Sequence, residues 1–521
     1  MSDTLIQALQ DPAVFGVEGP VELIETGISW VLLAGPYAYK IKKPLDLGFL
    51  DYSTLEKRRR CSREELRRNG WLAPQLYREV VAITGSIDAP RLGGAGPVLE
   101  YAVRMHRFHR EDQLSRQADR GALPVRWLDG LATTLADFHR RAEVVDETKP
   151  WGGPGHIRQW AVDNLDTLRQ CLADTPLVTP LAALADWSEA EVRQRADLLA
   201  ERQRQRWIRQ CHGDLHLNNV VVLEDRAVPF DAIEFNPELS AIDVLNEVAF
   251  LMMDLDARGY RGLGFRFLDR YLDASGHVAG TGTIPFYAAY RALVRAKVAA
   301  LTLGDAADDE ARQAVLERCG DYLASACHWS WPAPPLLVIT HGFSGSGKST
   351  LAGRLLETLE AVRFRSDVVR REIHGLAPGA HSEAAPGEGI YSEAANARTH
   401  ERLRALATEA LSAKLPVILD ATFLHRAERD AVRALARRLG VAMIILHCNA
   451  PESVLRLRVS SRHAGGGDVS EADTTILNRQ LRSVEPLTAE ELPYTVSVDT
   501  HHPPSLLTLS RRLRRRARVP D

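Results

Sequence analysis

Residues 342–350 constrain the fold of this chain more than any other feature. Their sequence, GFSGSGKST, matches the pattern G-x-x-x-x-G-K-[ST]; the apolar run LLVIT precedes it and the helical pattern TLAGRLLETL follows it. Glycines let successive backbone N–H groups turn inward on phosphate oxygens, and the dipole of a following helix favours negative charge. These flanks disfavour an accidental glycine-rich turn. We therefore expect a strand, a phosphate-binding loop (P-loop) and a helix.

The P-loop supplies a set of candidate nucleotide-binding residues. We expect Lys348 to reach the β- and γ-phosphates of ATP and the hydroxyl of Ser349 to ligate Mg²⁺. The candidate cofactor-binding residues of the loop are Gly342, Ser344, Gly345, Ser346, Gly347, Lys348, Ser349 and Thr350.

Length and composition predict a soluble protein of two domains. A chain of 521 residues is too long for one ordinary hydrophobic core. The segment WPAPP at 331–335 cannot continue a helix and suits an extended connector. We place the boundary there, which gives a domain at 1–331 and a second domain at 332–521. A net charge of −3 shows no overall bias towards polyanions, so any contact with nucleic acid has to be local.

Cysteine usage and hydropathy favour a cytoplasmic protein. The six cysteines are scattered without a CxxC pair, which fits a reducing compartment and argues against a zinc knuckle. The first residues carry no basic-then-apolar signal, and the chain has no long uncharged apolar run. We expect no membrane partner.

The C-terminal domain has the pattern of a parallel α/β fold. Helical patterns separate short apolar runs, as alternating β and α elements require. The runs lie at 336–340, 362–366, 416–420, 441–447 and 494–498. The N-terminal domain is expected to begin with strands within 20–42 and to be mostly helical from about residue 54, including a helical stretch at 286–328.

Two acids of the C-terminal domain are candidates for chemistry. Asp367, in RSDVVR, follows the second apolar run, where a carboxylate can accept the proton of a substrate hydroxyl. Ser366 or Asp367 can instead cap the following helix, and the two roles are compatible. Asp420 ends PVILD and suits a Mg²⁺-side acid; its alternative is simple solvation of a strand end.

Three arginines, Arg456, Arg458 and Arg462, fall within one helical stretch. Such a helix can act as a lid whose arginines close on the transferring phosphoryl group. We expect Arg456 and Arg462 to clamp the transition state. The alternative is a solvated basic helix face.

Over about 335–500 the chain resembles the P-loop kinases of the polynucleotide 5′-kinase, gluconate kinase, chloramphenicol phosphotransferase and zeta-toxin group. The resemblance rests on GFSGSGKST, RSDVVR, ILDAT, RLRVSSR and the later Gln480 and Glu485-Pro486-Leu487. It implies an AAA-type ATP-binding kinase domain in which Asp367 contacts the acceptor hydroxyl and Arg370 helps to hold the acceptor. It names no acceptor, because these enzymes phosphorylate very different ones.

A second constellation lies in HGDLHLNN at 212–219, with the spacing H-x-D-x-x-x-x-N. In kinase-like folds an aspartate orients the acceptor hydroxyl and an asparagine five residues later holds Mg²⁺. Asp214 and Asn219 fit these roles, and Asp231 in VPFD is a second metal ligand. Upstream, Lys40 can reach the α- and β-phosphates, with Glu65 as its ion-pair partner.

This set resembles the aminoglycoside phosphotransferase and kinase-like superfamily over about 20–300, which implies a bilobal fold. One departure is that 25–30, where a phosphate-covering loop is expected, has no G-x-G-x-x-G pattern. A domain kept for binding or regulation is therefore an alternative to an active kinase. Candidate acids for a polyamine acceptor, or else a solvated helix face, are Asp243, Glu247, Asp254 and Asp256.

The whole chain resembles bacterial two-domain proteins that join an aminoglycoside phosphotransferase-like domain to a P-loop ATP-binding domain. We expect an ATP- and Mg²⁺-dependent kinase acting on a hydroxyl acceptor, a small molecule or a polynucleotide 5′ end, with its surest site in the P-loop domain. The alternatives are that the N-terminal domain is the main small-molecule kinase, or that the protein is a nucleotide-responsive regulatory or toxin-like binding protein. The arginine-rich tail at 511–518 is interpreted as a solvated helix rather than a polynucleotide contact.

Overall fold

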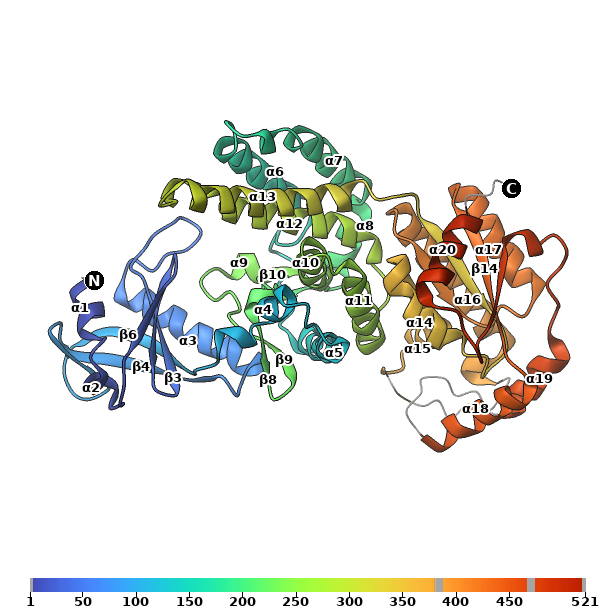
Figure 1. Ribbon diagram of the computed structural model, residues 1–521, viewed down its shortest axis with the longest axis horizontal. Helices are drawn as coiled ribbons and strands as arrows, with labels where there is room; N and C mark the ends of the chain where they lie inside the picture. Colours follow the sequence, from blue (N-terminus) through green and yellow to red (C-terminus); the bar gives the residue numbers. More distant parts are fainter. Residues whose placement is uncertain (1–2, 379, 381–387, 466–473, 518–521) are drawn as a thin grey trace. The chain divides into compact units, whose positions relative to one another are not determined.

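The computed structural model describes residues 3–378, 380, 388–465 and 474–517 (Figure 1). The chain divides into two compact units. The first unit comprises residues 1–131, 141–152 and 203–247, and the second comprises 132–140, 153–202 and 248–521. The proline-rich segment 331–335 lies within the second unit, and the domain boundary near residue 332 remains a prediction.

A six-stranded antiparallel sheet forms the start of the first unit, in the order β1-β2-β3-β6-β4-β5. Its strands are β1 (Glu22–Glu25), β2 (Ser29–Ala34), β3 (Tyr37–Lys42), β4 (Tyr77–Ser86), β5 (Ala89–Leu92) and β6 (Val98–His106). The strands predicted within 20–42 are confirmed. The expectation of a mostly helical chain from residue 54 is wrong for 77–106, which forms three more strands. The stretches REVVAIT in β4 and EYAVRMH in β6 are rich in the β-branched and aromatic residues that strands favour.

Helix α3 (Leu55–Leu72) packs against β4 and β6. The hydroxyl of Thr54 accepts a hydrogen bond from the backbone N–H of Lys57 and so caps the start of the helix. The buried face of α3 includes Cys61, Glu65 and Asn69. A carboxylate on this buried face requires a cationic partner, which the sheet provides.

The remaining part of the first unit brings two short strand pairs together, β7 with β10 and β8 with β9. The elements are α1 (Asp3–Ala8), α2 (Pro12–Phe15), η1 (Arg110–Asp112), α4 (Leu114–Asp119), β7 (Ile208–Gln210), η3 (Leu217–Asn219), β8 (Val220–Leu223), β9 (Arg226–Pro229), α9 (Pro237–Ser240) and β10 (Ala241–Asp243). Helices α5 (Val125–Arg141) and α10 (Val244–Ala257) contribute residues to both units.

Helices before the proline-rich segment form one part of the second unit. They are α6 (Pro154–Cys171), η2 (Pro176–Val178), α7 (Leu181–Gln194), α8 (Ala196–Arg204), α11 (Arg261–Ser275), η4 (Thr281–Thr283), α12 (Ile284–Ala300), η5 (Leu303–Asp305) and α13 (Asp309–Ser330). The predicted helical stretch 286–328 is two helices, α12 and α13, which pack on one another. The second helix restarts where Asp308 caps the N–H of Ala311.

A five-stranded parallel sheet forms the other part of the second unit, in the order β12-β13-β11-β14-β15. The strands are β11 (Leu336–His341), β12 (Val362–Arg365), β13 (Val417–Asp420), β14 (Ala442–Asn449) and β15 (Thr495–Asp499). All five predicted strands are present within one or two residues. The middle strand, β11, is buried along its whole length, as a parallel sheet covered on both faces requires.

Helices join and cover these strands: α14 (Lys348–Leu359), α15 (Ser366–Ile373), η6 (Gly389–Tyr391), α16 (Glu393–Ser412), α17 (Arg426–Leu439), α18 (Glu452–Gly465), α19 (Thr474–Ser483), η7 (Leu492–Tyr494) and α20 (Leu506–Arg516). Helix α14 packs with α20, and α16 packs with α17. Parallel connections are right-handed, so a strand order that reverses at β11 puts these two helix groups on opposite faces. The P-loop lies at this reversal, where parallel α/β sheets bind ligands.

None of the described helices is both long enough and apolar enough to cross a membrane. The exposed arginines of α20 include Arg511 and Arg512, as a solvated helix predicts, whereas Arg518 lies outside the described residues.

A histidine pair, one ring buried and one partly buried, joins the central strand of the parallel sheet to its neighbour. His341 on β11 and His447 on β14 are register partners, and their Nδ1 atoms lie 2.7 Å apart, so one ring donates and the other accepts. Burial lowers the pKa of His341 to about 3, and burial likewise lowers the pKa of His447. Both rings are therefore neutral in the folded sheet at pH 7.

This pair predicts a loss of stability on acidification. The unfolded chain protonates both histidines below about pH 6.5, whereas the folded sheet resists protonation of His341 down to about pH 3. Stability is complete above pH 6.5 and falls towards pH 3, by up to about 1.4 kcal/mol per pH unit for each ring. The free energy of unfolding, measured with urea at pH 7.5, 6.5 and 5.5, tests this pH dependence.

The double variant His341→Gln with His447→Gln keeps polar side chains but removes both titrating groups, so its unfolding is expected to depend less on pH. His501→Gln, at an exposed histidine, is the matched control and is expected to behave as the natural protein. An unchanged pH dependence in the double variant would contradict the assignment of neutral rings.

Candidate active sites

The P-loop turns between β11 and α14 in a conformation that needs glycine. Gly345 has φ +80°, and a Cβ there would lie 2.6 Å from the carbonyl oxygen of Leu455. Gly347 has φ +76° and precedes the first residue of α14. Within the described structure no side chain caps α14, so the first N–H groups of this helix remain available to a phosphate.

Neighbouring side chains satisfy the backbone of the P-loop. The Thr500 hydroxyl donates to the Ser346 carbonyl oxygen (2.7 Å), and Arg458 donates to that of Gly345 (3.3 Å). The N–H of Ser344 donates to Oε1 of Gln480 (2.8 Å). The loop is thus fixed from α18, α19 and the end of β15. The carbonyl oxygens of Gly345 and Ser346 and the N–H of Ser344 are thus engaged by the protein. The N–H groups at the uncapped start of α14 are the candidates for a phosphate ligand.

The predicted lysine, serine and acid of the P-loop domain come together. Lys348 donates to the carbonyl oxygen of Phe343 (3.3 Å), so its ammonium group lies over the turn. The hydroxyl of Ser349 donates to Oδ1 of Asp420 (3.0 Å), which ends β13. Asp420 is buried, so the alternative of simple strand-end solvation is wrong. Thr350, by contrast, is exposed on α14.

Asp367 lies in the first turn of α15, directly after β12. The helix begins after Arg365, and no side-chain hydrogen bond caps it in the described chain, so the capping alternative for Ser366 and Asp367 is wrong. The Asp367 carboxylate forms no hydrogen bond or ion pair with any residue that the structure describes. Burial raises its pKa, and the charges of Arg365, Lys348 and Arg370 oppose this rise. A raised pKa and an uncommitted carboxylate suit a proton acceptor.

Arg370 and Arg456 are held by neighbouring groups. Arg370 donates to the carbonyl oxygen of Ile390 (2.9 Å) and to Oδ1 of Asn396 (2.7 Å). Arg456 donates to Glu452 (2.8 Å) and Asn478 (2.9 Å) on α18 and α19, away from the P-loop backbone. The transition-state role of Arg456 remains a prediction, and the side chain of Arg462 lies outside the described residues.

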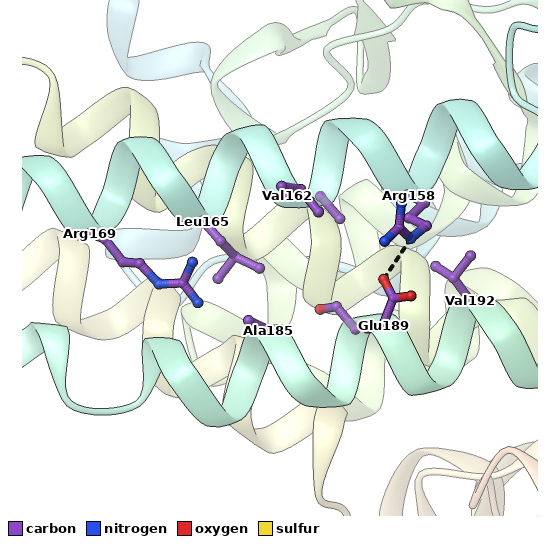
Figure 2. A pocket seen from close by; sticks show the side chains of 9 residues that line it. Arg158, Val162, Leu165, Arg169, Ala185, Glu189 and Val192 are labelled. Carbon is purple, nitrogen blue, oxygen red and sulfur yellow. Dashed lines mark hydrogen bonds and ion pairs between the residues drawn. The ribbon is translucent and has the colours of Figure 1, made fainter.

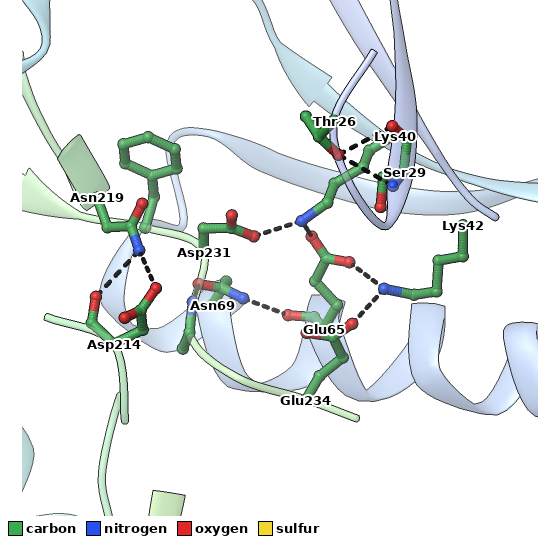
Figure 3. Close-up of polar contacts among 12 residues, drawn as sticks. Thr26, Ser29, Lys40, Lys42, Glu65, Asn69, Asp214, Asn219, Asp231 and Glu234 are labelled. Carbon is green, nitrogen blue, oxygen red and sulfur yellow. Dashed lines mark hydrogen bonds and ion pairs between the residues drawn. The ribbon is translucent and has the colours of Figure 1, made fainter. Parts of the chain in front are cut away.

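Lys40, Glu65 and Asp231 form one ion-pair cluster in the first unit (Figure 3). Nζ of Lys40 lies 3.0 Å from Oε1 of Glu65 and also pairs with Asp231. Burial opposes the charge of Lys40, but the carboxylates of Asp231 and Glu65 outweigh it and raise the pKa of Lys40 well above its usual value. The lysine is therefore charged, as a phosphate ligand must be.

Asp214 and Asn219 form the second half of this site. Nδ2 of Asn219 donates to Oδ2 of Asp214 (3.0 Å). The N–H of Phe230 donates to the Asn219 carbonyl oxygen (2.9 Å), which holds the end of segment 212–219 beside Asp231. Asp231 has φ +64°, uncommon for a residue other than glycine, and its carboxylate is 39% exposed. Such backbone strain is typical of functional positions.

A second lysine, Lys42, completes the cluster and was not predicted. Its side chain is 1% exposed, lies 2.7 Å from Oε2 of Glu65 and also pairs with Glu234. Tyr52 donates to the same Glu234 carboxylate. The sequence carried a signal for Lys42, because the alternation in Tyr39-Lys40-Ile41-Lys42 puts both lysines on one side of β3. Glu65 thus pairs with the ammonium groups of Lys40 and Lys42, which lie on the same side of β3.

The acids considered for a polyamine acceptor have internal partners. Asp243, Glu247 and Asp254 are buried, so the alternative of a solvated helix face is wrong. Glu247 accepts a hydrogen bond from the N–H of Gly213 (2.7 Å) in segment 212–219, and Asp256 pairs with Arg261 (3.1 Å). These acids support structure rather than forming an open acceptor surface.

A small cavity of about 50 Å³ lies between α6 and α7 (Figure 2). The ion pair between Arg158 and Glu189 (2.6 Å) closes one end of it. None of the predicted site residues lines this cavity, so it belongs to neither candidate site.

Known proteins match this chain either in its C-terminal part alone or over most of its length. The sequence family described as "AAA domain" matches residues 337–487. The protein "Uncharacterized protein Rv2004c" of Mycobacterium tuberculosis (strain ATCC 25618 / H37Rv) is 30% identical over 452 residues, which cover 86% of this chain and 88% of that protein.

Two solved structures are similar in part. A gluconokinase from Sinorhizobium meliloti 1021 is 24% identical over 35% of this chain and 94% of its own, with a TM-score of 0.24. A choline kinase from Cryptosporidium parvum Iowa II is 13% identical over 63% of this chain and 96% of its own, with a TM-score of 0.38. The predicted α+β and parallel α/β fold class is confirmed: the first unit contains an antiparallel sheet with helices, and the second contains a parallel sheet with a P-loop.

The buried lysine predicts a stability effect at the N-terminal site. Lys42→Met removes the cation from two buried carboxylates, Glu65 and Glu234, and is expected to destabilise the first unit by about 3–5 kcal/mol. Lys43→Met is the matched control: Lys43 pairs with Glu25, whose side chain is 62% exposed, so its loss is expected to cost about 0–1 kcal/mol. Urea unfolding measures both, and equal midpoints for the two variants would contradict the cluster.

Proposed function

The chain belongs to the family of the mycobacterial protein Rv2004c, and for this member we propose an ATP- and Mg²⁺-dependent phosphotransferase that moves the γ-phosphate to a hydroxyl group. The P-loop domain and the kinase-like fold support phosphotransfer in general. The acceptor is a small molecule or a polynucleotide 5′ end. The observation that carries the proposal is the hydrogen bond of Ser349 to Asp420 beside an uncommitted Asp367.

The donor set of the P-loop site fits Mg²⁺. This ion prefers oxygen ligands and is usually held by one or two protein groups together with substrate phosphates. The Ser349 hydroxyl and the Asp420 carboxylate offer such oxygens at the carboxyl edge of the sheet. Bound Mg²⁺ would neutralise charge on the β- and γ-phosphates.

The residues of the chain have separate tasks in the proposed reaction. The uncapped start of α14 and Lys348 bind the terminal phosphates. Asp367 accepts the proton of the acceptor hydroxyl while that oxygen forms a bond to the γ-phosphorus, and the bond from the γ-phosphorus to the bridging oxygen breaks to release ADP. Arg370 stands three residues further along α15, on the proposed acceptor side.

A second activity is supported by the N-terminal constellation. Its five predicted residues form two contact sets: Lys40 pairs with Glu65 and Asp231, and Asn219 donates to Asp214. Asp231 and Asn219 would hold Mg²⁺, and Asp214 would orient an acceptor hydroxyl. This arrangement favours a second kinase site over a purely regulatory domain.

Single-site variants separate the two activities. Lys348→Ala is expected to lower transfer from γ-labelled ATP to its acceptor by about 100-fold or more, because it removes a phosphate ligand present in the transition state. The acceptors are fractionated small molecules and nucleic-acid 5′ ends. Lys149→Ala, at an exposed lysine, is the matched control.

Loss of all product in Asp214→Ala, with none lost in Lys348→Ala, would transfer the principal activity to the N-terminal site. Tight ATP binding without transfer to any acceptor would instead indicate a nucleotide-responsive binding protein.

The raised pKa of Asp367 predicts the acid side of the pH profile. Only the carboxylate accepts a proton, so the rate of Lys348-dependent transfer falls as pH drops through a pKa above the ordinary 3.8. Asp367→Asn is expected to lower kcat by about 10²–10⁴-fold, to retain ATP binding and to abolish this acid limb. A variant that kept both rate and limb would exclude Asp367 as the base.

A further inference from the structure

Strand β12 carries a buried arginine, Arg363, and a partly buried one, Arg365, that no part of the proposed reaction uses. Arg363 and Arg365 alternate along VRFR, so their side chains leave the same side of the strand. The side chain of Arg363 is only 4% exposed. A buried guanidinium group is strongly unfavourable unless carboxylates or carbonyl groups compensate it.

The compensating acids come from helix α11, in the part of the chain before the proline-rich segment. Nε and Nη2 of Arg363 donate to Oδ1 and Oδ2 of Asp269 at 2.8 and 2.9 Å, which is a bidentate ion pair. Asp273, one helical turn later, accepts from Arg365 at 2.9 Å. Helices α11 and α14 pack side by side within the second unit (Figure 1).

The other end of the Arg363 guanidinium lies directly behind the proposed Mg²⁺ ligands. Its Nη1 donates to the carbonyl oxygen of Ser349 (3.1 Å) and lies 3.5 Å from Oδ2 of Asp420. The opposite carboxylate oxygen of Asp420 accepts from the Ser349 hydroxyl. A Cβ on Gly353 would lie 3.2 Å from Nη1, so the glycine leaves room for this group.

A guanidinium group in this place competes with Mg²⁺ for Asp420. The bidentate ion pair of Arg363 with Asp269 is shorter than the 3.5 Å distance from Arg363 to Asp420. The arginine charge is therefore compensated mainly by α11. Removal of the Asp269 charge would leave the buried cation with Asp420 at 3.5 Å and Asp273 at 3.7 Å, and Asp273 already pairs with Arg365. The Asp420 carboxylate would then be drawn towards Arg363 and away from a metal ion.

We propose that Asp269 is a positioning residue of the P-loop site: it holds Arg363 on the Ser349 carbonyl group and keeps the Asp420 carboxylate available to Mg²⁺. The metal site of the P-loop domain therefore depends on a helix from the preceding part of the chain. This inference rests on the proposed function of the P-loop site.

The test measures the Mg²⁺ concentration that half-saturates binding of a fluorescent, non-hydrolysable ATP analogue to the full chain. Only binding that is lost in Lys348→Ala is counted. Asp269→Asn is expected to raise this concentration by about tenfold or more, the usual effect of removing a partner that supports a metal ligand. Binding of the analogue without Mg²⁺ is expected to stay within about twofold, since the phosphate-binding N–H groups are unaffected.

A second variant separates positioning from general damage. Asp269→Asn combined with Arg363→Gln removes the competing cation together with its counter-ion, so the Mg²⁺ requirement is expected to return to within about threefold of the natural protein. A role in packing alone predicts no recovery, and such a result would overturn the proposal.

Glu357→Gln is the matched control. Glu357 pairs with Arg266 at 2.8 Å and so also joins α14 to α11, but it does not contact Arg363. Its Mg²⁺ requirement is expected to be unchanged, and a rise equal to that of Asp269→Asn would overturn the proposal. If Asp269→Asn does not fold, Asp273→Asn, at a side chain 19% exposed, replaces it with an expected rise of about threefold.

The experiment distinguishes failure of the proposed function from failure of the proposed role of Asp269. Absence of any Lys348-dependent binding in the natural protein would refute the proposed function. Normal Lys348-dependent binding with an unchanged Mg²⁺ requirement in Asp269→Asn would refute only the role of Asp269.

Discussion

The hydrogen bond between Ser349 and Asp420 joins the helix after the P-loop to the end of strand β13, and the proposed site of the P-loop domain depends on this contact. One partner begins the helix after the P-loop, and the other ends a strand that lies next to β11 in the sheet. Only a parallel sheet whose strand order reverses at β11 brings these two chain positions to one edge. The P-loop, the adjacent acid and the uncommitted Asp367 all follow from that topology.

Both proposed sites hold charge by sharing counter-ions. In the first unit Glu65 contacts two lysines, Lys40 and Lys42. In the second unit Arg363 contacts Asp269 and lies near Asp420. Buried charges arranged this way are stable only together, because removal of one member leaves the others uncompensated. Such sharing couples the proposed site residues to elements distant in the sequence. Through Asp269, a helix that precedes residue 331 supports the proposed P-loop site.

The sequence predicted those parts whose geometry is local. The P-loop, five strands and the positions of Asp367 and Asp420 depend on short patterns with fixed consequences, namely apolar runs followed by polar residues at strand ends. Asp214 and Asn219 were found for the same reason, since Asn219 follows Asp214 by five positions in one short segment.

The rest depends on contacts between distant residues. Arg363 and Asp269 are 94 positions apart, and no local pattern connects them. The pairing of Lys42 with Glu234 spans 192 positions, although the alternation of lysines on β3 signalled a second buried cation. Strands β4 to β6 were missed because their polar alternate positions made 77–106 look like connecting chain within a helical region.

A crystal structure of the full chain with Mg²⁺ and a non-hydrolysable ATP analogue tests the central claim most directly. The account predicts terminal phosphates on the N–H groups at the start of α14, Mg²⁺ on Ser349 and Asp420, and the Asp367 carboxylate facing the γ-phosphate with room for a hydroxyl group. Phosphates bound only beside Lys40, or an Asp367 carboxylate directed away from the γ-phosphate, would contradict it.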